Sequence, residues 1–144
     1  MHTVRQCLKT KGDAIWSIHP SASVYDALQL MADKDIGALL VIEGDKVLGI
    51  FSERDYARKV ILHGKTSRET LVRDIMTSQV IFVNIDQSIE DCMGLITNKR
   101  IRHLPVLEGD KLAGVISIGD VVKEIIAEQE FVITQLGNYI TGKR

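Results

Sequence analysis

Short apolar runs alternate with amphipathic stretches along most of the chain. Segments 15–18 and 80–83 are short and rich in β-branched and aromatic residues, which predicts two strands. Each is followed by a serine, Ser23 or Ser88, that can cap a helix. Apolar residues then recur at the i, i+3, i+4, i+7 spacing of one helix face. Each half of the chain therefore begins with a strand and a helix.

Two further strands and a second helix are expected in each half. Continuous apolar runs are typical of buried strands, and the pairs Gly44-Asp45 and Gly109-Asp110 are typical of the tight turn of a hairpin. Buried strands are thus predicted at 38–42 and 104–107, return strands at 47–51 and 112–116, and second helices from Ser52 and Ser117.

An internal repeat orders these elements. Residues 15–61 align with residues 80–126 without a gap, and 15 of the 47 positions are identical. Self-similarity at a fixed spacing indicates two copies of one supersecondary unit. The predicted fold class is α/β (α+β), with two tandem strand–helix–strand–strand–helix repeats that pack sheet to sheet with pseudo-twofold symmetry.

The repeat also predicts the domain boundaries. We expect repeat 1 with its lead-in at 4–62, a polar linker at 63–71 and repeat 2 at 72–130. A long amphipathic helix at 121–140 extends beyond repeat 2. Its apolar stripe is broader than one small domain requires, which predicts a partner surface and a homodimer.

Composition and charge narrow the class of protein. The chain is 45% hydrophobic and 26% charged, as globular proteins are, and has 18 Lys and Arg against 19 Asp and Glu. This balance, without a basic arm, argues against binding to nucleic acid. No stretch is long and apolar enough to cross a membrane, and we see no export signal. Two cysteines without metal-ligand spacing indicate a reducing compartment, so we expect a cytoplasmic protein.

The motif Gly-x-x-Ser-x-x-Asp ends the last strand of each copy, at 49–55 and 114–120. A strand that leads into a helix presents free backbone N–H groups and the positive end of the helix dipole, which suit a phosphate. The aspartate, Asp55 or Asp120, could accept hydrogen bonds from two ribose hydroxyls. The alternative is that each Ser–Asp pair, Ser52 with Asp55 and Ser117 with Asp120, only caps its helix.

Basic side chains near these motifs could hold phosphates, although they could equally form a solvated helix surface. They are Arg54, Arg58 and Lys59 in copy one and the segment 99–103 in copy two. Catalysis finds little support, because the chain lacks a metal-ligating His pair, a Gly-x-Ser-x-Gly elbow, a P-loop and a Gly-x-Gly-x-x-Gly motif. We therefore expect a protein that is not an enzyme and holds no metal.

These features resemble the cystathionine-β-synthase (CBS) domain. The resemblance rests on the Gly-x-x-Ser-x-x-Asp motif of each copy, on Leu104-Pro105-Val106 and on the lead-in Asp74-Ile75-Met76-Thr77, and it covers about residues 4–130. Two such domains in tandem resemble a Bateman module. Copy one departs from the pattern with Leu40 where copy two has Pro105, on a buried strand that should not touch a ligand.

The resemblance implies a regulatory module with a ligand cleft on each side of the interface between the repeats. Such clefts bind AMP, ADP or ATP, or sometimes NAD or S-adenosylmethionine, and modules pair into disc-like homodimers. Carried over by position, the resemblance implies that Asp55 and Asp120 bind ribose hydroxyls and that Ser52 and Ser117 lie near ribose or phosphate. The remaining implied contacts are Ile18, His19, Pro20, Met76, Thr77 and Val83 around the base, and Gly37, Ala38, Arg102, His103, Leu104, Arg54 and Arg58 at the phosphates.

Two hypotheses follow. The first is a non-catalytic signal-transduction module that binds adenine nucleotide and changes how it engages an effector protein. The second is an interaction module that dimerises without a ligand and whose Ser and Asp residues serve only as helix caps.

Overall fold

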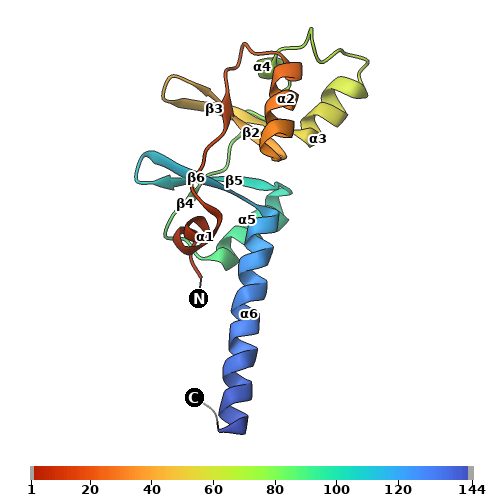
Figure 1. The fold of residues 1–144 in the computed structure, drawn as a ribbon. Helices are drawn as coiled ribbons and strands as arrows, with labels where there is room; N and C mark the ends of the chain where they lie inside the picture. Colours follow the sequence, from red (N-terminus) through yellow and green to blue (C-terminus); the bar gives the residue numbers. More distant parts are fainter. Residues whose placement is uncertain (1, 143–144) are drawn as a thin grey trace. The chain divides into compact units, whose positions relative to one another are not determined.

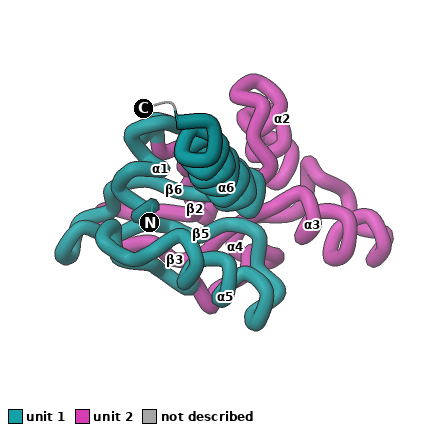
Figure 2. Tube along the Cα trace, turned by 90° about the horizontal axis from the view of Figure 1, so that it is seen from below, with its two compact units in different colours: residues 1–14, 81–144 teal, residues 15–80 magenta. Residues whose placement is uncertain are grey.

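The computed structural model describes residues 2–142, which form two compact units. One unit comprises residues 15–80, and the other combines residues 1–14 with 81–144 (Figure 2). The repeats predicted from the sequence form the bulk of these units. Their lead-in segments, however, are exchanged: the segment before repeat 1 packs with repeat 2, and the segment before repeat 2 packs with repeat 1.

The unit of residues 15–80 contains a three-stranded sheet in the order β1-β2-β3. The central strand β2 pairs in parallel with β1 and antiparallel with β3. The strands are β1 (Ser17–Ile18), β2 (Ala38–Glu43) and β3 (Lys46–Ser52), and the helices are α2 (Val24–Lys34), α3 (Glu53–Asp55), the π-helical segment η1 (Tyr56–Ile61) and α4 (Val72–Ile75) (Figure 1).

The unit of residues 1–14 and 81–144 has the same sheet, in the order β4-β5-β6. Its strands are β4 (Val83–Asn84), β5 (His103–Glu108) and β6 (Lys111–Ser117), and its helices are α1 (Val4–Lys11), α5 (Ile89–Lys99) and α6 (Ile118–Thr141). The predicted order strand, helix, hairpin, helix is therefore confirmed in both copies. Gly44 and Gly109 have φ values of 60° and 63°, the left-handed backbone that each hairpin turn requires.

Two details differ from the sequence prediction. The first strand of each copy was expected at 15–18 and 80–83, but the paired residues are Ser17–Ile18 and Val83–Asn84, so the second strand also begins later and extends one residue beyond the predicted range. A strand ends where its backbone no longer pairs with its neighbour. The edge strand β1 pairs with β2 over two residues, and β4 pairs with β5 over two residues. The second helix of copy one is also irregular, because three α-helical residues are followed by the π-helical segment η1.

Close packing of the lead-in segments explains the glycine of each motif. A Cβ at Gly49 would lie 2.7 Å from the backbone oxygen of Thr77 and 2.9 Å from Sδ of Met76. Thr77 in turn forms two backbone hydrogen bonds with Ile50 of β3, so the segment after α4 lies against that strand. In the other unit a Cβ at Gly114 would lie 2.8 Å from Cδ2 of Leu8 in α1. The glycines thus admit the lead-in segments beside the motifs.

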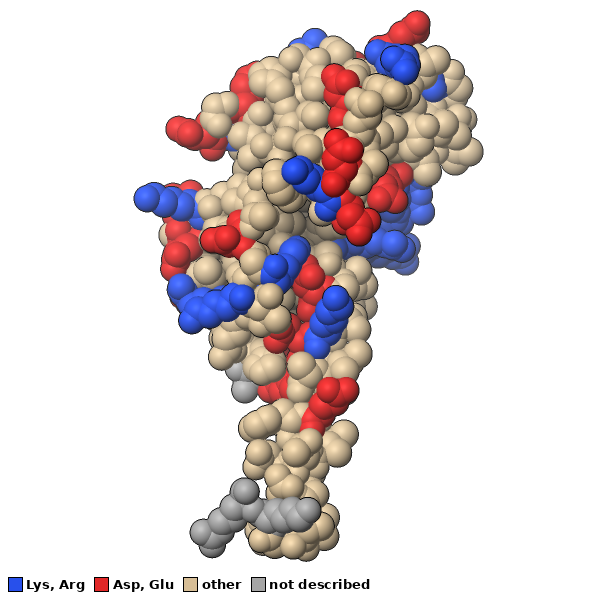
Figure 3. All heavy atoms as spheres, in the orientation of Figure 1, with Lys and Arg blue, Asp and Glu red and all other residues tan. Residues whose placement is uncertain are grey.

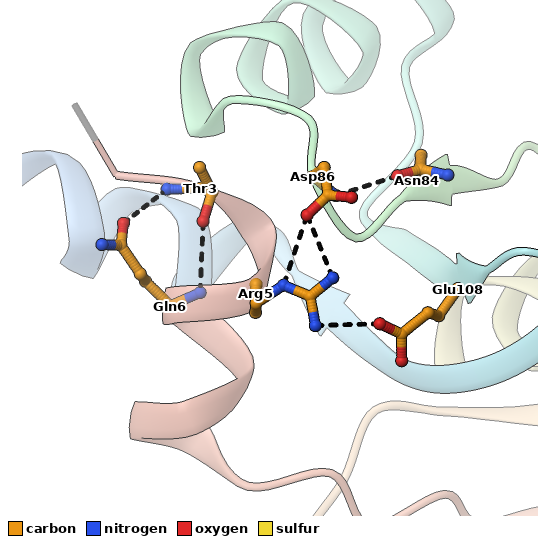
Figure 4. A network of polar contacts seen from close by, with 6 residues as sticks. All are labelled: Thr3, Arg5, Gln6, Asn84, Asp86 and Glu108. Atoms are coloured by element: carbon orange, nitrogen blue, oxygen red, sulfur yellow. Dashed lines mark hydrogen bonds and ion pairs between the residues drawn. The ribbon is translucent and has the colours of Figure 1, made fainter.

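Polar contacts hold α1 in its unit (Figure 4). The Arg5 guanidinium donates to Oδ1 of Asp86 at 3.0 Å and forms an ion pair with Glu108 at 2.9 Å. The N-terminus of α1 is closed by a capping box between Thr3 and Gln6. Val4, Cys7 and Leu8 of α1 are buried in the same core as residues of α5 and β5.

The predicted linker also packs on its unit. The backbone oxygens of Ser67 and Thr70 accept hydrogen bonds from the first N–H groups of α2, and Thr70 is buried. Residues 63–71 therefore satisfy donors that the N-terminus of α2 leaves open.

Candidate functional site

The junction of β6 and α6 is built around Ser117 and Asp120. The Ser117 N–H donates to Oδ2 of Asp120 at 2.8 Å, and the Asp120 N–H donates to Oγ of Ser117 at 3.2 Å. This capping box closes the first turn of a 24-residue helix. The sequence predicted both residues at this place, and the box shows that they do cap α6.

A lysine from the exchanged lead-in completes the junction. Nζ of Lys11 lies 2.6 Å from Oδ2 of Asp120 and donates to the backbone oxygen of Val115 at 2.6 Å. Burial acts to raise the pKa of Asp120, but the hydrogen bonds from Lys11 and from the Ser117 N–H outweigh it and lower that pKa. Asp120 is therefore a carboxylate at neutral pH, with its contacts gathered on one oxygen.

The junction of β3 and α3 repeats this geometry with different partners. Oδ2 of Asp55 accepts from the N–H and the hydroxyl of Ser52 at 3.0 and 3.1 Å. Oδ1 of Asp55 accepts from the Thr77 hydroxyl at 3.1 Å and lies 3.2 Å from Nζ of Lys59. Both oxygens of Asp55 are thus engaged within the unit, and the residue is buried.

The beginning of each central strand lies beside the motif of its unit. Ala38 pairs with Ser52, and His103 pairs with Ser117. One residue earlier, the backbone oxygens of Gly37 and Arg102 accept hydrogen bonds from the first helical N–H, at 3.1 and 2.9 Å. The structure therefore brings these four residues to the helix N-termini.

His103 and Ala38 occupy the same position in the two units, but only His103 is titratable. Burial lowers the pKa of His103, and the nearby Lys11 and Arg102 lower it further against the opposing effect of Asp120. His103 is accordingly neutral at pH 7. Lys11 and Arg102 remain as the positive groups near the junction.

Other residues of the predicted site lie apart from the motifs within their own unit. Ile18 ends β1, and His19 and Pro20 follow it, on the opposite edge of the sheet from β3. Thr77 pairs with Ile50 of β3. Nε2 of His19 lies 3.3 Å from Oε2 of Glu43, and Nδ1 of His19 accepts from the Ser21 N–H, while Pro20 is buried. Their contact with a ligand base remains a prediction.

Two further predicted contacts belong to a core. Val83 and Leu104 are 1% and 0% exposed, and both pack with Ile116 and Cys92 in the interior of their unit. Their side chains are buried in this core, and contact of these two residues with a ligand remains a prediction. Arg54 and Arg58, in contrast, are exposed on the turns that follow Ser52.

Sequence reasoning missed Lys11 as part of the site. The signal lay just outside the aligned repeat: extending the offset of 65 residues toward the N-terminus places Lys11 opposite Met76 and Gly12 opposite Thr77, in the two lead-in segments. Thr77 was expected near a ligand base, but the structure shows its hydroxyl on Asp55. Lys59 was expected either to hold a phosphate or to form a solvated helix surface, but its Nζ donates to the Ile75 oxygen at 3.0 Å and lies 3.2 Å from Oδ1 of Asp55.

A hollow of 510 Å³ lies beside the motif of the unit of residues 15–80. It is lined by Leu28, Met31, Ala32, Asp35, Ile36, Gly37, Glu53 and Tyr56. Among residues 2–142 we find no group of three or more His, Cys, Asp or Glu side chains that could hold a metal ion. Over the same residues, none of the helices combines the length and the apolar character of a membrane span.

Comparison with known proteins identifies the family. The CBS domain model matches residues 12–62 and 72–127, which is most of the chain and covers both repeats. The chain belongs to the CBS domain family. The mitochondrial CBS domain-containing protein CBSX3 of Arabidopsis thaliana is 38% identical over an alignment of 149 positions that covers 97% of this chain and 72% of the relative.

Solved CBS structures share the fold. A protein with CBS domains from Burkholderia ambifaria MC40-6 is 53% identical, with a TM-score of 0.85 over 89% of this chain and 96% of that one. The CBS domain pair of protein MJ0100, in complex with 5′-methylthioadenosine and S-adenosyl-L-methionine, has a TM-score of 0.77 over 89% of this chain and 98% of that one. At 19% identity the latter likeness is one of fold.

Proposed function

We propose that this CBS protein is a non-catalytic regulatory module that binds an adenine nucleotide, AMP, ADP, ATP or NAD. The observation that carries the proposal is the junction at Ser117 and Asp120. There β6 ends at the N-terminus of a long helix, and an ionised carboxylate keeps its contacts on Oδ2. A carboxylate has two oxygens, so Oδ1 can accept ribose hydroxyls without breaking the capping box.

The charge of the junction supports a phosphorylated ligand. Lys11 and Arg102 supply positive charge, and the N-terminus of α6 adds the positive end of its dipole. These groups favour an anionic nucleotide over an uncharged nucleoside. The MJ0100 domain pair, which has the same fold and is complexed with two adenosine-containing molecules, supports an adenosine-type ligand in general.

The two motifs are not equivalent in this proposal. Asp120 has its contacts on one oxygen, whereas both oxygens of Asp55 already accept hydrogen bonds or an ion pair. A ribose at Asp55 would have to displace Thr77 or Lys59. We therefore expect the stronger binding at Asp120, and the position of the ligand relative to the two repeats remains a prediction.

Regulation would follow from differential affinity. A ligand that binds one conformation more tightly shifts the population toward it, and the shifted surface would engage an effector protein or a second copy differently. Relatives that carry CBS domains include one named for signal transduction, which agrees with a regulatory role. The disc-like pairing of modules implied by the family remains a prediction.

The capping boxes favour a second candidate, an interaction module that acts without a ligand. Both Ser–Asp pairs form complete boxes, which by themselves account for the presence of these residues. Under this function Ser and Asp stabilise the helix starts, and removing them would lower stability only.

A thermal-shift panel on nucleotide-stripped protein separates the two functions. Ligand at about 100 times Kd stabilises the folded state by about 2.7 kcal/mol, which for a chain of this size is a shift of several degrees. We expect such a shift with one or more of AMP, ADP, ATP and NAD, and its loss in Asp120→Ala. The matched control is Asp91→Ala, which removes the same residue type from the first turn of α5, after the cap Ser88.

The control should keep the ligand-induced shift, although its basal Tm falls. If no nucleotide shifts the wild-type Tm, or if Asp120→Ala shifts as the wild type does, the ribose assignment is wrong. The interaction module would then be the better account.

A further inference from the structure

The C-terminal part of α6 carries an apolar face that its own unit does not cover. The core contacts of α6 are made near its start, where Val121 is buried and Ile125 packs against the core. Farther along, apolar side chains recur at the three- and four-residue spacing of one helix face. They are Val132, Ile133, Leu136, Tyr139 and Ile140, with exposed fractions between 49% and 85%.

No charged residue interrupts this face. Residues 131–142 contain no Asp, Glu, Lys or Arg, and Figure 3 shows the corresponding part of α6 without blue or red atoms on the side in view. An exposed apolar stripe of this length on a helix marks an interaction surface. An uncharged stripe favours a partner that is itself apolar and uncharged over the same length.

We propose that this face pairs with the same face of a second copy of the chain, as two antiparallel helices. The area supports the partner: a fully exposed side chain of this size presents on the order of 150 Å², so five side chains that are on average about two thirds exposed present roughly 500 Å². Two such faces bury about 1,000 Å² together, the size at which specific interfaces begin.

The charges that flank the stripe determine the orientation. Glu124, Glu128 and Glu130 precede the uncharged stretch in the sequence. Parallel overlap of residues 131–142 stacks the acidic flanks of the two copies, whereas antiparallel overlap places them at opposite ends of the pair. Antiparallel helix dipoles also attract. In this register Leu136 lies at the centre, and Val132 lies opposite Ile140 of the second copy.

The molecular mass in solution tests the pairing. Leu136→Glu places a charge at the centre of the face, and because Leu136 is 57% exposed the variant should keep its fold. Thr134→Glu places the same charge on the opposite side of the same helix and is the matched control. By sedimentation velocity we expect the wild type and Thr134→Glu to have at least twice the mass of Leu136→Glu, with equal helix content by circular dichroism.

Equal masses for all three proteins, or an equal loss in both variants, would overturn the proposal. A monomeric wild type would also overturn the pairing, and the apolar face of α6 would then have to bind a different partner. The pairing does not depend on nucleotide, so its failure leaves the proposed function untouched.

Oxidative cross-linking tests the orientation. Cys7 and Cys92 are buried, so they contribute little background. We expect a mixture of Val132→Cys and Ile140→Cys chains to form a mixed disulfide faster than either chain cross-links with itself. Efficient self-cross-linking of Ile140→Cys alone would contradict the antiparallel arrangement.

Discussion

At the scale of single residues, the two aspartates show how one motif yields two different sites. Ser52 and Asp55 repeat Ser117 and Asp120 in the sequence, and both pairs form the same capping box. The difference comes from residues outside the motif. Thr77 and Lys59 fill the second oxygen of Asp55, whereas Lys11 joins the oxygen of Asp120 that the cap already uses.

Replacing Lys11 tests this electrostatic arrangement. Lys11→Met removes the hydrogen bond and the positive charge that hold down the pKa of Asp120, so we expect that pKa to rise. Carbon-detected NMR titration of the Asp120 carboxyl measures it. Lys9→Met, which removes an exposed charge from the same helix, should leave the Asp120 pKa near its wild-type value.

The consequence for stability has a definite sign. A carboxyl whose pKa is lower in the folded state stabilises the protein above its unfolded pKa, and this stabilisation is lost as the pH falls through the lower, folded value. In Lys11→Met the two pKa values lie closer together, so this loss should be smaller and should be complete at a higher pH than in the wild type. An unchanged acid transition together with an unchanged Asp120 pKa would contradict the assigned ion pair.

His103 gives a pH dependence nearer neutrality. Its pKa is lowered mainly by burial, so the unfolded chain takes up a proton more readily than the folded one. We expect the free energy of unfolding to decrease as the pH falls through the ordinary histidine pKa of about 6.5. Urea titrations at pH 7.5 and 5.5 should show a smaller decrease in His103→Gln, and a difference as large as in the wild type would rule out His103 as its source.

At the scale of elements, local sequence was sufficient for some features and insufficient for others. Serine caps at 23, 52, 88 and 117, hairpin glycines and the apolar spacing of the helices are local signals, and the structure confirms the elements they predicted. The exchange of lead-in segments is not a local property. It depends on which sheet offers space for α1 and α4, and the patterns of Val4–Lys11 and Val72–Ile75 do not encode that choice.

The motif glycines provide a test of lead-in packing. Gly49→Ala places a Cβ against the backbone oxygen of Thr77, which cannot move without breaking the pairing with Ile50. We expect a loss of about 2 kcal/mol in the free energy of unfolding, as for overpacking in general. Gly114→Ala meets only the end of the flexible Leu8 side chain and should cost about half as much.

Gly94→Ala is the control for these substitutions. Gly94 lies inside α5 with no atom within 4 Å of an added Cβ, so alanine should stabilise the protein by about 0.5–1 kcal/mol. Chemical denaturation measures all three variants. A Gly49→Ala protein as stable as the wild type would show that the segment after α4 does not pack on β3 as described.

At the scale of the whole molecule, the repeat was visible in the sequence because duplicated residues can be counted directly. The match of 15 positions in 47 predicted two copies, and the CBS domain model matches both. The functional difference between the copies was not predictable in the same way. It arises from Lys11, Lys59 and Thr77, whose partners are set by tertiary packing.

The central claim is that Asp120 holds the ribose of a bound nucleotide. Isothermal titration calorimetry with AMP and with 2′,3′-dideoxy-AMP, on the wild type and on Asp120→Ala, tests it most directly. Hydrogen bonds to a charged group contribute about 1.5–3 kcal/mol, so the wild type should bind AMP roughly ten-fold or more tightly than the dideoxy analogue. Asp120→Ala should bind both equally weakly. Equal affinity of the wild type for the two nucleotides would contradict the claim, and a preference that persists in Asp120→Ala would assign the ribose to another residue.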